Sequence, residues 1–145
     1  MDTYFEILPE DTKQTFSLLS NSSLIKSFYL AGGTALALQI GHRISQDLDF
    51  FTSENFDESV LIQKIPDIGD FQLEKKSDQT IIGILNNTKI SFIGYKYPFL
   101  APFKNILNMN VADIIDIACM KIDTISSRGA KRDFIDVFFV VKEII

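Results

Sequence analysis

The sequence predicts an α/β or α+β fold, in which helices flank a small mixed β-sheet. Apolar residues recur at helical spacing near both ends of the chain, and strand-like runs fill its middle. The length of 145 residues fits one domain, and 46% hydrophobic with 23% charged residues is ordinary for a protein with a packed core. We therefore expect a single domain over residues 1–145.

The first element should be a helix over residues 9–27. Pro9 suits a first helical turn, and Glu10 and Asp11 favour the N-terminal end of a helix. The polar run Asn21-Ser22-Ser23 can break this segment into two shorter helices.

A strand over residues 28–31 should lead into the turn Gly32-Gly33, and a helix should start at Thr34. We expect a second strand to follow and to end in Asp47 and Asp49, which are two residues apart. The order strand, glycine turn, helix and strand places the glycines beside the two acids.

The middle of the chain should be mostly β-structure. A short helix over 57–65 is expected to stop at Pro66, and Asn86-Asn87 is a typical hairpin turn. The segment 97–102 contains two prolines and reads as a connection. The expected strands cover residues 71–75, 80–85 and 89–95.

The last third should be helical. We expect one helix over 111–127, stopped by Gly129, and a final helix over about 133–144. Each carries an apolar stripe that should face the core. The first stripe comprises Val111, Ile114, Ile115, Ala118, Ile122 and Ile125, and the second comprises Phe134, Val137, Phe138 and Val141.

Asp47 and Asp49 should point to the same face of a strand, because side chains at i and i+2 do so. Carboxylate oxygens suit Mg²⁺, which proteins usually hold with one or two carboxylates plus substrate phosphates. Gly32 and Gly33 lack β-carbons that would keep a phosphate away, and the next helix offers unpaired N–H donors. This combination favours chemistry on a nucleoside triphosphate. The plainer alternative is an acidic strand end beside an ordinary tight turn.

Lys121 and Arg128 are seven residues apart on one expected helix, so they project from the same face, ~10.5 Å apart along the axis. Lys121 sits at the edge of the apolar stripe, where a lysine either extends to solvent or meets an anion. The two cations could clamp a triphosphate. Alternatively, Lys121 is a surface lysine and Arg128 interacts with the C-terminal helix dipole.

Composition excludes some functional classes. The net charge of −5 argues against binding nucleic acid through a generally basic surface. An RNA substrate would therefore require a local basic patch or a basic partner. Cys119 is the single cysteine, which excludes an intramolecular disulfide and fits a cytoplasmic location. We see no signal peptide and no apolar run that approaches the ~20 residues of a membrane span, so no membrane association is expected.

Three motifs resemble the AbiEii-type nucleotidyltransferases of the polymerase β-like superfamily. They are Leu30-Ala31-Gly32-Gly33-Thr34, then Gly41-His42-Arg43-Ile44-Ser45-Gln46-Asp47-Leu48-Asp49-Phe50-Phe51, and finally Lys121-x6-Arg128 followed by Arg132-Asp133-x-x-Asp136. The resemblance implies a minimal nucleotidyltransferase fold that moves a nucleoside monophosphate from an NTP to an acceptor. It also implies a toxin of a toxin–antitoxin or abortive-infection system, Mg²⁺ as cofactor, an RNA (tRNA included) or protein acceptor, and a cognate antitoxin.

By this resemblance the site residues take definite roles. Asp47 and Asp49 would be the metal ligands, and with Lys121 and Asp133 they would form the catalytic set. Asp133 would be a late carboxylate that orients or deprotonates the acceptor. The nucleotide-binding residues would be Gly32, Gly33, Thr34, Arg43, Ser45, Lys121 and Arg128.

Five polar residues near these motifs keep alternative interpretations. Ser45 could cap a helix instead of binding phosphate, and Arg43 could form a surface ion pair instead of contacting substrate. Asp133 fits a helix N-cap well, and Asp136 reads as structural. His42, the sole histidine, follows a glycine at a helix end and reads as a cap.

Ser91 is a departure from the family pattern. It stands on a later strand where polymerase-like enzymes carry a third carboxylate, and a hydroxyl is neither a strong base nor a strong ligand for a hard cation. Either Asp133 takes over that role, or full two-metal chemistry is lost. The rival hypothesis is therefore a catalytically impaired nucleotide-binding or protein-interaction module of the same fold.

Overall fold

The computed structural model describes residues 3–127 and 130–144, and within them the chain forms one seven-stranded sheet with helices around it. The strand order is β3-β4-β5-β2-β1-β7-β6, with β2–β5 and β1–β7 parallel and the other pairs antiparallel. The expected mixed sheet is thus confirmed. The strands are β1 Tyr29–Ala31, β2 Leu48–Thr52, β3 Phe71–Ser77, β4 Thr80–Leu85, β5 Thr88–Gly94, β6 Lys104–Ile106 and β7 Met109–Val111.

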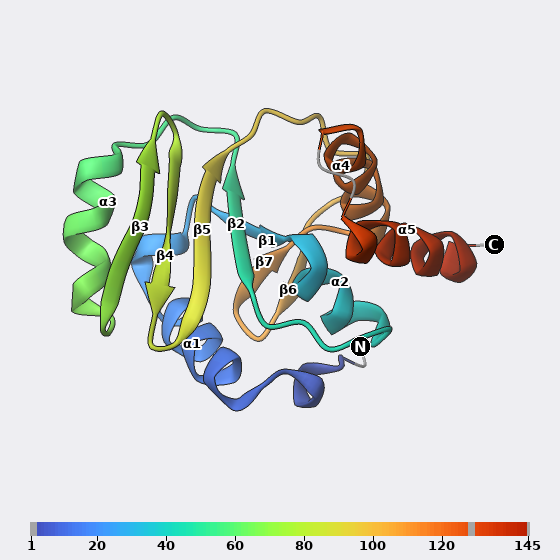
Figure 1. The fold of residues 1–145 in the computed structure, drawn as a ribbon, viewed down its shortest axis with the longest axis horizontal. Coiled ribbons are helices and arrows are strands. Elements are labelled where there is room, and N and C mark those ends of the chain that lie inside the picture. Colours follow the sequence, from blue (N-terminus) through green and yellow to red (C-terminus); the bar gives the residue numbers. More distant parts are fainter. Residues whose placement is uncertain (1–2, 128–129, 145) are drawn as a thin grey trace.

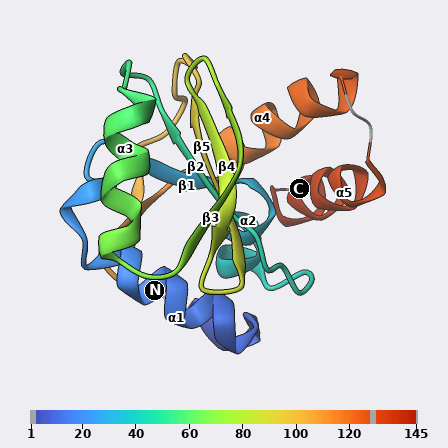
Figure 2. The ribbon, with the colours of Figure 1, turned by 60° about the vertical axis from the view of Figure 1, so that its left-hand side comes forward.

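Helices lie at both ends of this sheet. In Figures 1 and 2, α3 lies at one end of the molecule, beside β3, and the pair α4 and α5 lies at the other. The helix α4 packs against α2 as well as α5. The helices are α1 Glu10–Ser20, α2 Gly32–Ile40, α3 Glu58–Lys64, α4 Ile114–Ser127 and α5 Lys131–Ile144. None of those in the described ranges is long and apolar enough to cross a membrane.

Several element boundaries follow the sequence-based expectations. The first helix begins after Pro9 and ends at Ser20, and a separate 3₁₀ turn follows over Ser23–Ile25, so the predicted break is confirmed. The side chain of Asp57 caps α3 by accepting hydrogen bonds from two backbone N–H groups. Asn86 and Asn87 both have positive φ, as the predicted β4–β5 hairpin requires.

Two expectations about the glycine pair and the acids were wrong. Gly32 is the first residue of α2, so the pair forms the first turn of the helix instead of a separate turn before Thr34. The strand β2 begins at Leu48, so Asp47 and Asp49 stand at its start and not at its end. The reason is that the apolar residues after Asp49 pair with β1 and β5 in the middle of the sheet.

The C-terminal region also differs from the expectation. Residues 104–111 form the β6–β7 hairpin, so the helix α4 begins at Ile114 and not at Val111. The first predicted apolar stripe faces the core only in part, because Ile114 and Ala118 pack against it whereas Ile122 is 58% exposed. The second stripe does not face the core, because Phe138 is 61% exposed. On α5 the buried residues are Asp133, Asp136 and Val140. The predicted stop at Gly129 falls outside the described residues.

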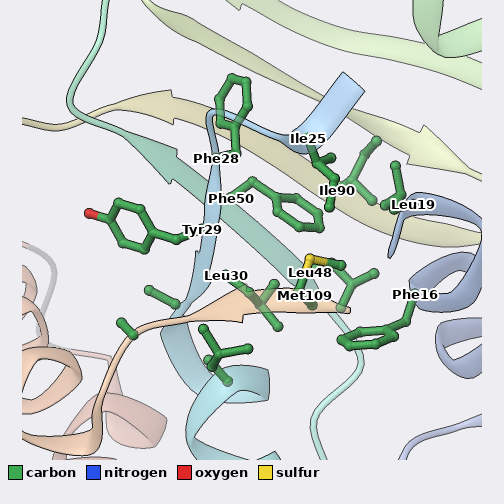
Figure 3. Packing of buried hydrophobic residues seen from close by; sticks show 14 of the residues in the cluster. Phe16, Leu19, Ile25, Phe28, Tyr29, Leu30, Leu48, Phe50, Ile90 and Met109 are labelled. Carbon is green, nitrogen blue, oxygen red and sulfur yellow. The ribbon is translucent and has the colours of Figure 1, made fainter. Parts of the chain in front are cut away.

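The core packs the sheet against α1, α2 and α4 and is rich in phenylalanine. Phe16, Phe50 and Phe92 are almost completely buried, and the rings of Phe50 and Phe92 stack with centroids 5.3 Å apart. Figure 3 shows Phe16 and Leu19 of α1 pointing toward the side chains of the central strands. This packing holds β2 rigidly between β1 and β5 and so fixes the start of β2, where the two acids stand.

Candidate active site

Asp47 and Asp49 line the same hollow of the surface, whose volume is about 500 Å³. We call this the first hollow, and its walls include Arg43, Ser45, Asp47, Asp49, Ser91 and Lys121. Both aspartates are half-buried. The expectation that these two acids and Lys121 meet at one place is therefore met by the geometry.

The glycine pair sits directly against this site. Gly32 has φ +77°, and a β-carbon there would lie 2.7 Å from Oδ2 of Asp49. A β-carbon on Gly33 would lie 2.1 Å from Nη2 of Arg43. Only glycine therefore lets the first turn of α2 approach Asp49 and Arg43 so closely. The same turn brings the free N–H end of α2 to the acids, which is where an anion is stabilised.

Thr34 and Ser45 join α2 to the segment that leads into β2. Thr34 donates a hydrogen bond to the backbone carbonyl of Asp47, and Ser45 Oγ lies 2.7 Å from Thr34 Oγ1, to which it therefore donates. Thr34 is only 1% exposed, so its hydroxyl anchors the Asp47 backbone. Ser45 lines the first hollow, and the alternative that it caps a helix is wrong because the preceding helix ends at Ile40 with Gly41 as its C-cap and the next begins at Glu58.

Ser91 lies beside Asp49 on the neighbouring strand β5. Ser91 and Asp49 are partners in the β2–β5 register, and Ser91 Oγ donates a 2.7 Å hydrogen bond to Oδ1 of Asp49. The position beside Asp49 is thus occupied by a hydroxyl that orients the carboxylate without adding a charge.

Lys121 is buried between two carboxylates of α5. Its Nζ lies 2.8 Å from Oδ1 of Asp133 and 3.1 Å from Oδ2 of Asp136, while the side chain also lines the first hollow. Only 7% of the residue is exposed, so the alternative of a surface lysine is wrong. The charge of Lys121 is therefore held by two buried acids at the wall of the hollow that Asp49 also lines.

Asp136 holds together three basic side chains. His42 Nε2 lies 2.6 Å from Oδ1, and Arg43 donates to both carboxylate oxygens, from Nε at 2.7 Å and from Nη2 at 3.0 Å. Burial alone would raise the pKa of Asp136, but the hydrogen bonds from His42 and Arg43 and the charge of Lys121 hold it below its ordinary value. Asp136 is thus structural, as expected, and it also positions two predicted nucleotide-binding residues.

The contacts of Asp136 also decide between the alternative interpretations of Arg43 and His42. Arg43 forms an ion pair, but with a fully buried partner, and it also lines the first hollow. His42 is not a cap, because its ring binds Asp136 across the fold; its Nδ1 is buried without a hydrogen-bond partner in the described structure. The structure therefore links the residues before β2 to α5 through a single carboxylate.

Asp133 is completely buried at the start of α5 and binds Lys121. It is the third residue of that helix, and its own N–H donates to Ala130, so the N-cap alternative is wrong. Its carboxylate does not belong to the walls of the first hollow. Arg128 lies outside the described residues, so its predicted role stays a prediction.

The first hollow is also lined by two cations to which sequence analysis assigned no role. They are Lys89 of β5 and Arg132 of α5. Arg132 is part of the Arg-Asp-x-x-Asp motif, which could have identified it, whereas Lys89 carries no local signal. Together with Arg43 and Lys121 they surround the acids with positive charge on a chain whose net charge is −5.

The donor set at the acids fits a metal that arrives with a nucleotide. In residues 3–127 and 130–144 no group of three or more His, Cys, Asp or Glu side chains could hold a metal ion. Two carboxylates are nevertheless what Mg²⁺ uses when substrate phosphates supply other ligands. The missing β-carbon of Gly32 leaves room beside Oδ2 of Asp49. Asp47 and Asp49 would therefore hold Mg²⁺ together with a phosphate group.

Comparison with known proteins agrees with this geometry. The family model for the nucleotidyl transferase AbiEii toxin of type IV toxin–antitoxin systems matches residues 16–102. An uncharacterized protein of Aquifex aeolicus, aq_aa25, is 37% identical over 140 residues, which are 94% of this chain and 68% of that protein.

Solved structures share the fold. The crystal structure of JHP933 from Helicobacter pylori has a TM-score of 0.66 at 22% identity, over 93% of this chain and 68% of that one. The Megavirus polyadenylate synthase has a TM-score of 0.59 at 13% identity, over 92% of this chain and 32% of that one. The family model covers more than half of the chain, so the protein belongs to the AbiEii family of nucleotidyl transferase toxins and is a nucleotidyltransferase.

Proposed function

We propose that the protein uses Mg²⁺ to transfer a nucleoside monophosphate from an NTP to an RNA or protein acceptor, as the toxin of a toxin–antitoxin or abortive-infection system. The observation that carries this proposal is that Asp47, Asp49 and Lys121 line one hollow, although the acids stand at the start of β2 and the lysine on α4. Two acids suit a metal bound to phosphates, and the lysine suits the phosphates themselves.

The reaction needs few groups from the protein. An acceptor hydroxyl oxygen bonds to the α-phosphorus, the bond from that phosphorus to the bridging oxygen breaks, and pyrophosphate leaves with the electron pair. Mg²⁺, when bound by Asp47 and Asp49, would neutralise charge on the phosphates. The N–H groups of Gly32 and Gly33 cradle phosphate oxygens, and the hydroxyl of Ser45 would join them by turning its hydrogen away from Thr34 Oγ1.

Lys121 and Asp133 complete the proposed chemistry. Lys121 neutralises the triphosphate, and Asp133 orients the acceptor or takes its proton. The two are joined by a 2.8 Å ion pair, and Asp133 is completely buried outside the walls of the first hollow, so it would have to leave this pair to reach an acceptor. Asp136 holds Arg43 in place through two hydrogen bonds.

RNA is the acceptor to test first. Lys89 and Arg132 line the first hollow beyond the residues that the triphosphate requires, and a polynucleotide acceptor brings phosphates that need such cations. They form the local basic patch that an acidic protein requires for an RNA substrate. A protein acceptor is tested in parallel in the labelling experiment described below. A cognate antitoxin follows from the family.

The test uses the full chain with each α-labelled NTP, Mg²⁺, and total cellular RNA or protein. We expect a labelled covalent product that is lost with EDTA and with Asp49→Asn. The matched control Asp11→Asn changes an exposed aspartate on α1 and should leave transfer unchanged. Label transferred from γ-labelled instead of α-labelled nucleotide would show a kinase and contradict the proposal.

A second candidate is favoured by Ser91, which replaces a third carboxylate beside Asp49. In that case the protein binds nucleotides without transferring them. Nucleotide binding with no labelled product, across four NTPs and both kinds of acceptor, would support this binding module over the enzyme.

A further inference from the structure

A second hollow adjoins the first and differs from it in chemistry. Its volume is about 210 Å³, and Asp49, Ile93 and Lys121 line both hollows. The remaining walls come from the first residue of α2, from β2, from the residue after β5 and from α4. A molecule held by Asp49 and Lys121 therefore has two neighbouring spaces into which it can extend.

The walls of the second hollow are aromatic and apolar where those of the first are charged. They include Phe51, Tyr95, Ile117 and Met120, whereas four cations line the first hollow. The rings of Phe51 and Tyr95 meet edge to face with centroids 6.0 Å apart. Tyr95 also stacks on Tyr97, so the aromatic wall is supported from behind.

An NTP has the same division of chemistry as the two hollows. Its triphosphate is strongly anionic, whereas its base is a flat ring system that stacks on aromatic side chains. We infer that the second hollow seats the nucleobase of the NTP while the triphosphate occupies the first, with Asp49 and Lys121 at the junction. This inference rests on the proposed function and adds the place where the base is recognised.

Asp123 and Tyr95 form a polar pair in the same wall. Tyr95 Oη donates a 2.7 Å hydrogen bond to Oδ2 of Asp123, and that bond together with burial raises the pKa of Tyr95 to about 12. The phenol therefore stays a donor, and the carboxylate offers only acceptors. Asp123 consequently selects base edges by their N–H donors and is the specificity-determining residue of this hollow.

The test separates the base from the phosphates by comparing NTPs with inorganic triphosphate, which has no base. Equilibrium binding is measured by calorimetry with Mg²⁺ for wild type and for Tyr95→Ala. Stacking on one aromatic ring corresponds to a roughly 5- to 150-fold change in affinity. We expect a loss in that range for NTPs and less than about a twofold change for inorganic triphosphate.

The matched control is Phe103→Ala. Phe103 belongs to the same group of aromatic rings, through Tyr29 and Phe99, but does not line the second hollow. This variant should bind NTPs and inorganic triphosphate as wild type does. An equal loss of both ligands in Tyr95→Ala, or no loss of either, would overturn the base site.

Asp123→Asn is the second variant and keeps the test independent of core packing, because Asp123 is exposed. It exchanges one acceptor oxygen for an amide donor, so the order of affinity among the four NTPs should change while inorganic triphosphate is unaffected. An unchanged order contradicts the role of Asp123. If wild type binds neither kind of ligand, the proposed function itself fails, whereas NTPs that bind no better than inorganic triphosphate overturn only the base site.

Discussion

Ser91 donates its hydroxyl hydrogen to Asp49 across the β2–β5 register, at a distance of 2.7 Å. The hydrogen bond orients one carboxylate oxygen, yet it leaves Asp47 and Asp49 as the two acids of the site. Two carboxylates alone are a weak Mg²⁺ site, because that ion needs further oxygen ligands that a nucleotide supplies.

We therefore expect that Mg²⁺ alone does not stabilise the wild-type protein, whereas Mg²⁺ together with an NTP raises the melting temperature. Ser91→Asp adds a third carboxylate next to Asp49, so this variant should be stabilised by Mg²⁺ without nucleotide. Thermal unfolding with and without the ion measures both effects. Ser91→Asn is the neutral control, and equal stabilisation of all three proteins by the ion alone would contradict the two-acid site.

Asp136 should make stability depend on pH. Its pKa is lower in the folded protein than in the unfolded chain, so its stabilising contribution is present above the unfolded value near 3.8 and is lost as the pH falls below it. Asp136→Asn should lower the free energy of unfolding at pH 7 by about 3 kcal/mol, because a buried charge cluster loses its anion.

The measurement for Asp136 is urea unfolding at several pH values between about 2 and 7. The difference between wild type and Asp136→Asn should shrink as the pH falls below the unfolded value near 3.8, since the unfolded chain then binds a proton at Asp136 that the folded protein does not bind. A constant difference over the whole range would show that the loss comes from packing and not from charge.

The parts of the site that were predictable are local in sequence. The i, i+2 spacing predicted that Asp47 and Asp49 share a face, and the glycine pair predicted a close approach, because both features follow from backbone geometry alone. The direction in which β2 continues from the acids was missed. It depends on pairing with β1 and β5, which no local pattern reveals.

The polar face of α5 could not be predicted from sequence. Periodicity placed Phe134 and Phe138 toward the core, yet Asp133 and Asp136 are buried there. Their partners are distant in sequence, since His42 and Asp136 are 94 residues apart. The acids of this helix are buried because they neutralise cations from other parts of the chain. The hydrophobicity of the helix alone therefore predicts the wrong face as the buried one.

Gly33→Ala should act through Arg43. The new β-carbon would lie 2.1 Å from Nη2, and the guanidinium is a flexible end that can move, so we expect Arg43 to leave Asp136. Nucleotide affinity and stability should both fall. In an Arg43→Ala background the same change should have little further effect on stability, which a double-mutant cycle in urea measures. Additive losses would show that Gly33 matters for another reason.

Gly32→Ala should cost more than Gly33→Ala, because its φ of +77° is unfavourable for any residue with a β-carbon. The backbone conformation alone costs about 1–2 kcal/mol. The β-carbon would in addition press on Asp49, so Mg²⁺-dependent nucleotide binding should also weaken. Urea unfolding and calorimetry measure the two effects, and a neutral change in stability would contradict the left-handed conformation of Gly32.

The exposed face of α5 gives the last prediction. Phe138 is 61% exposed and Val140 is 1% exposed, although both are apolar residues of the same helix. Val140→Ala should lower the free energy of unfolding by about 1–3 kcal/mol through lost burial and a cavity. Phe138→Ser should change it by less than about 1 kcal/mol, because the ring is already largely in water. If Phe138→Ser proves as costly as Val140→Ala in urea unfolding, the ring must be covered in solution, and the predicted apolar stripe of α5 would regain a packing role.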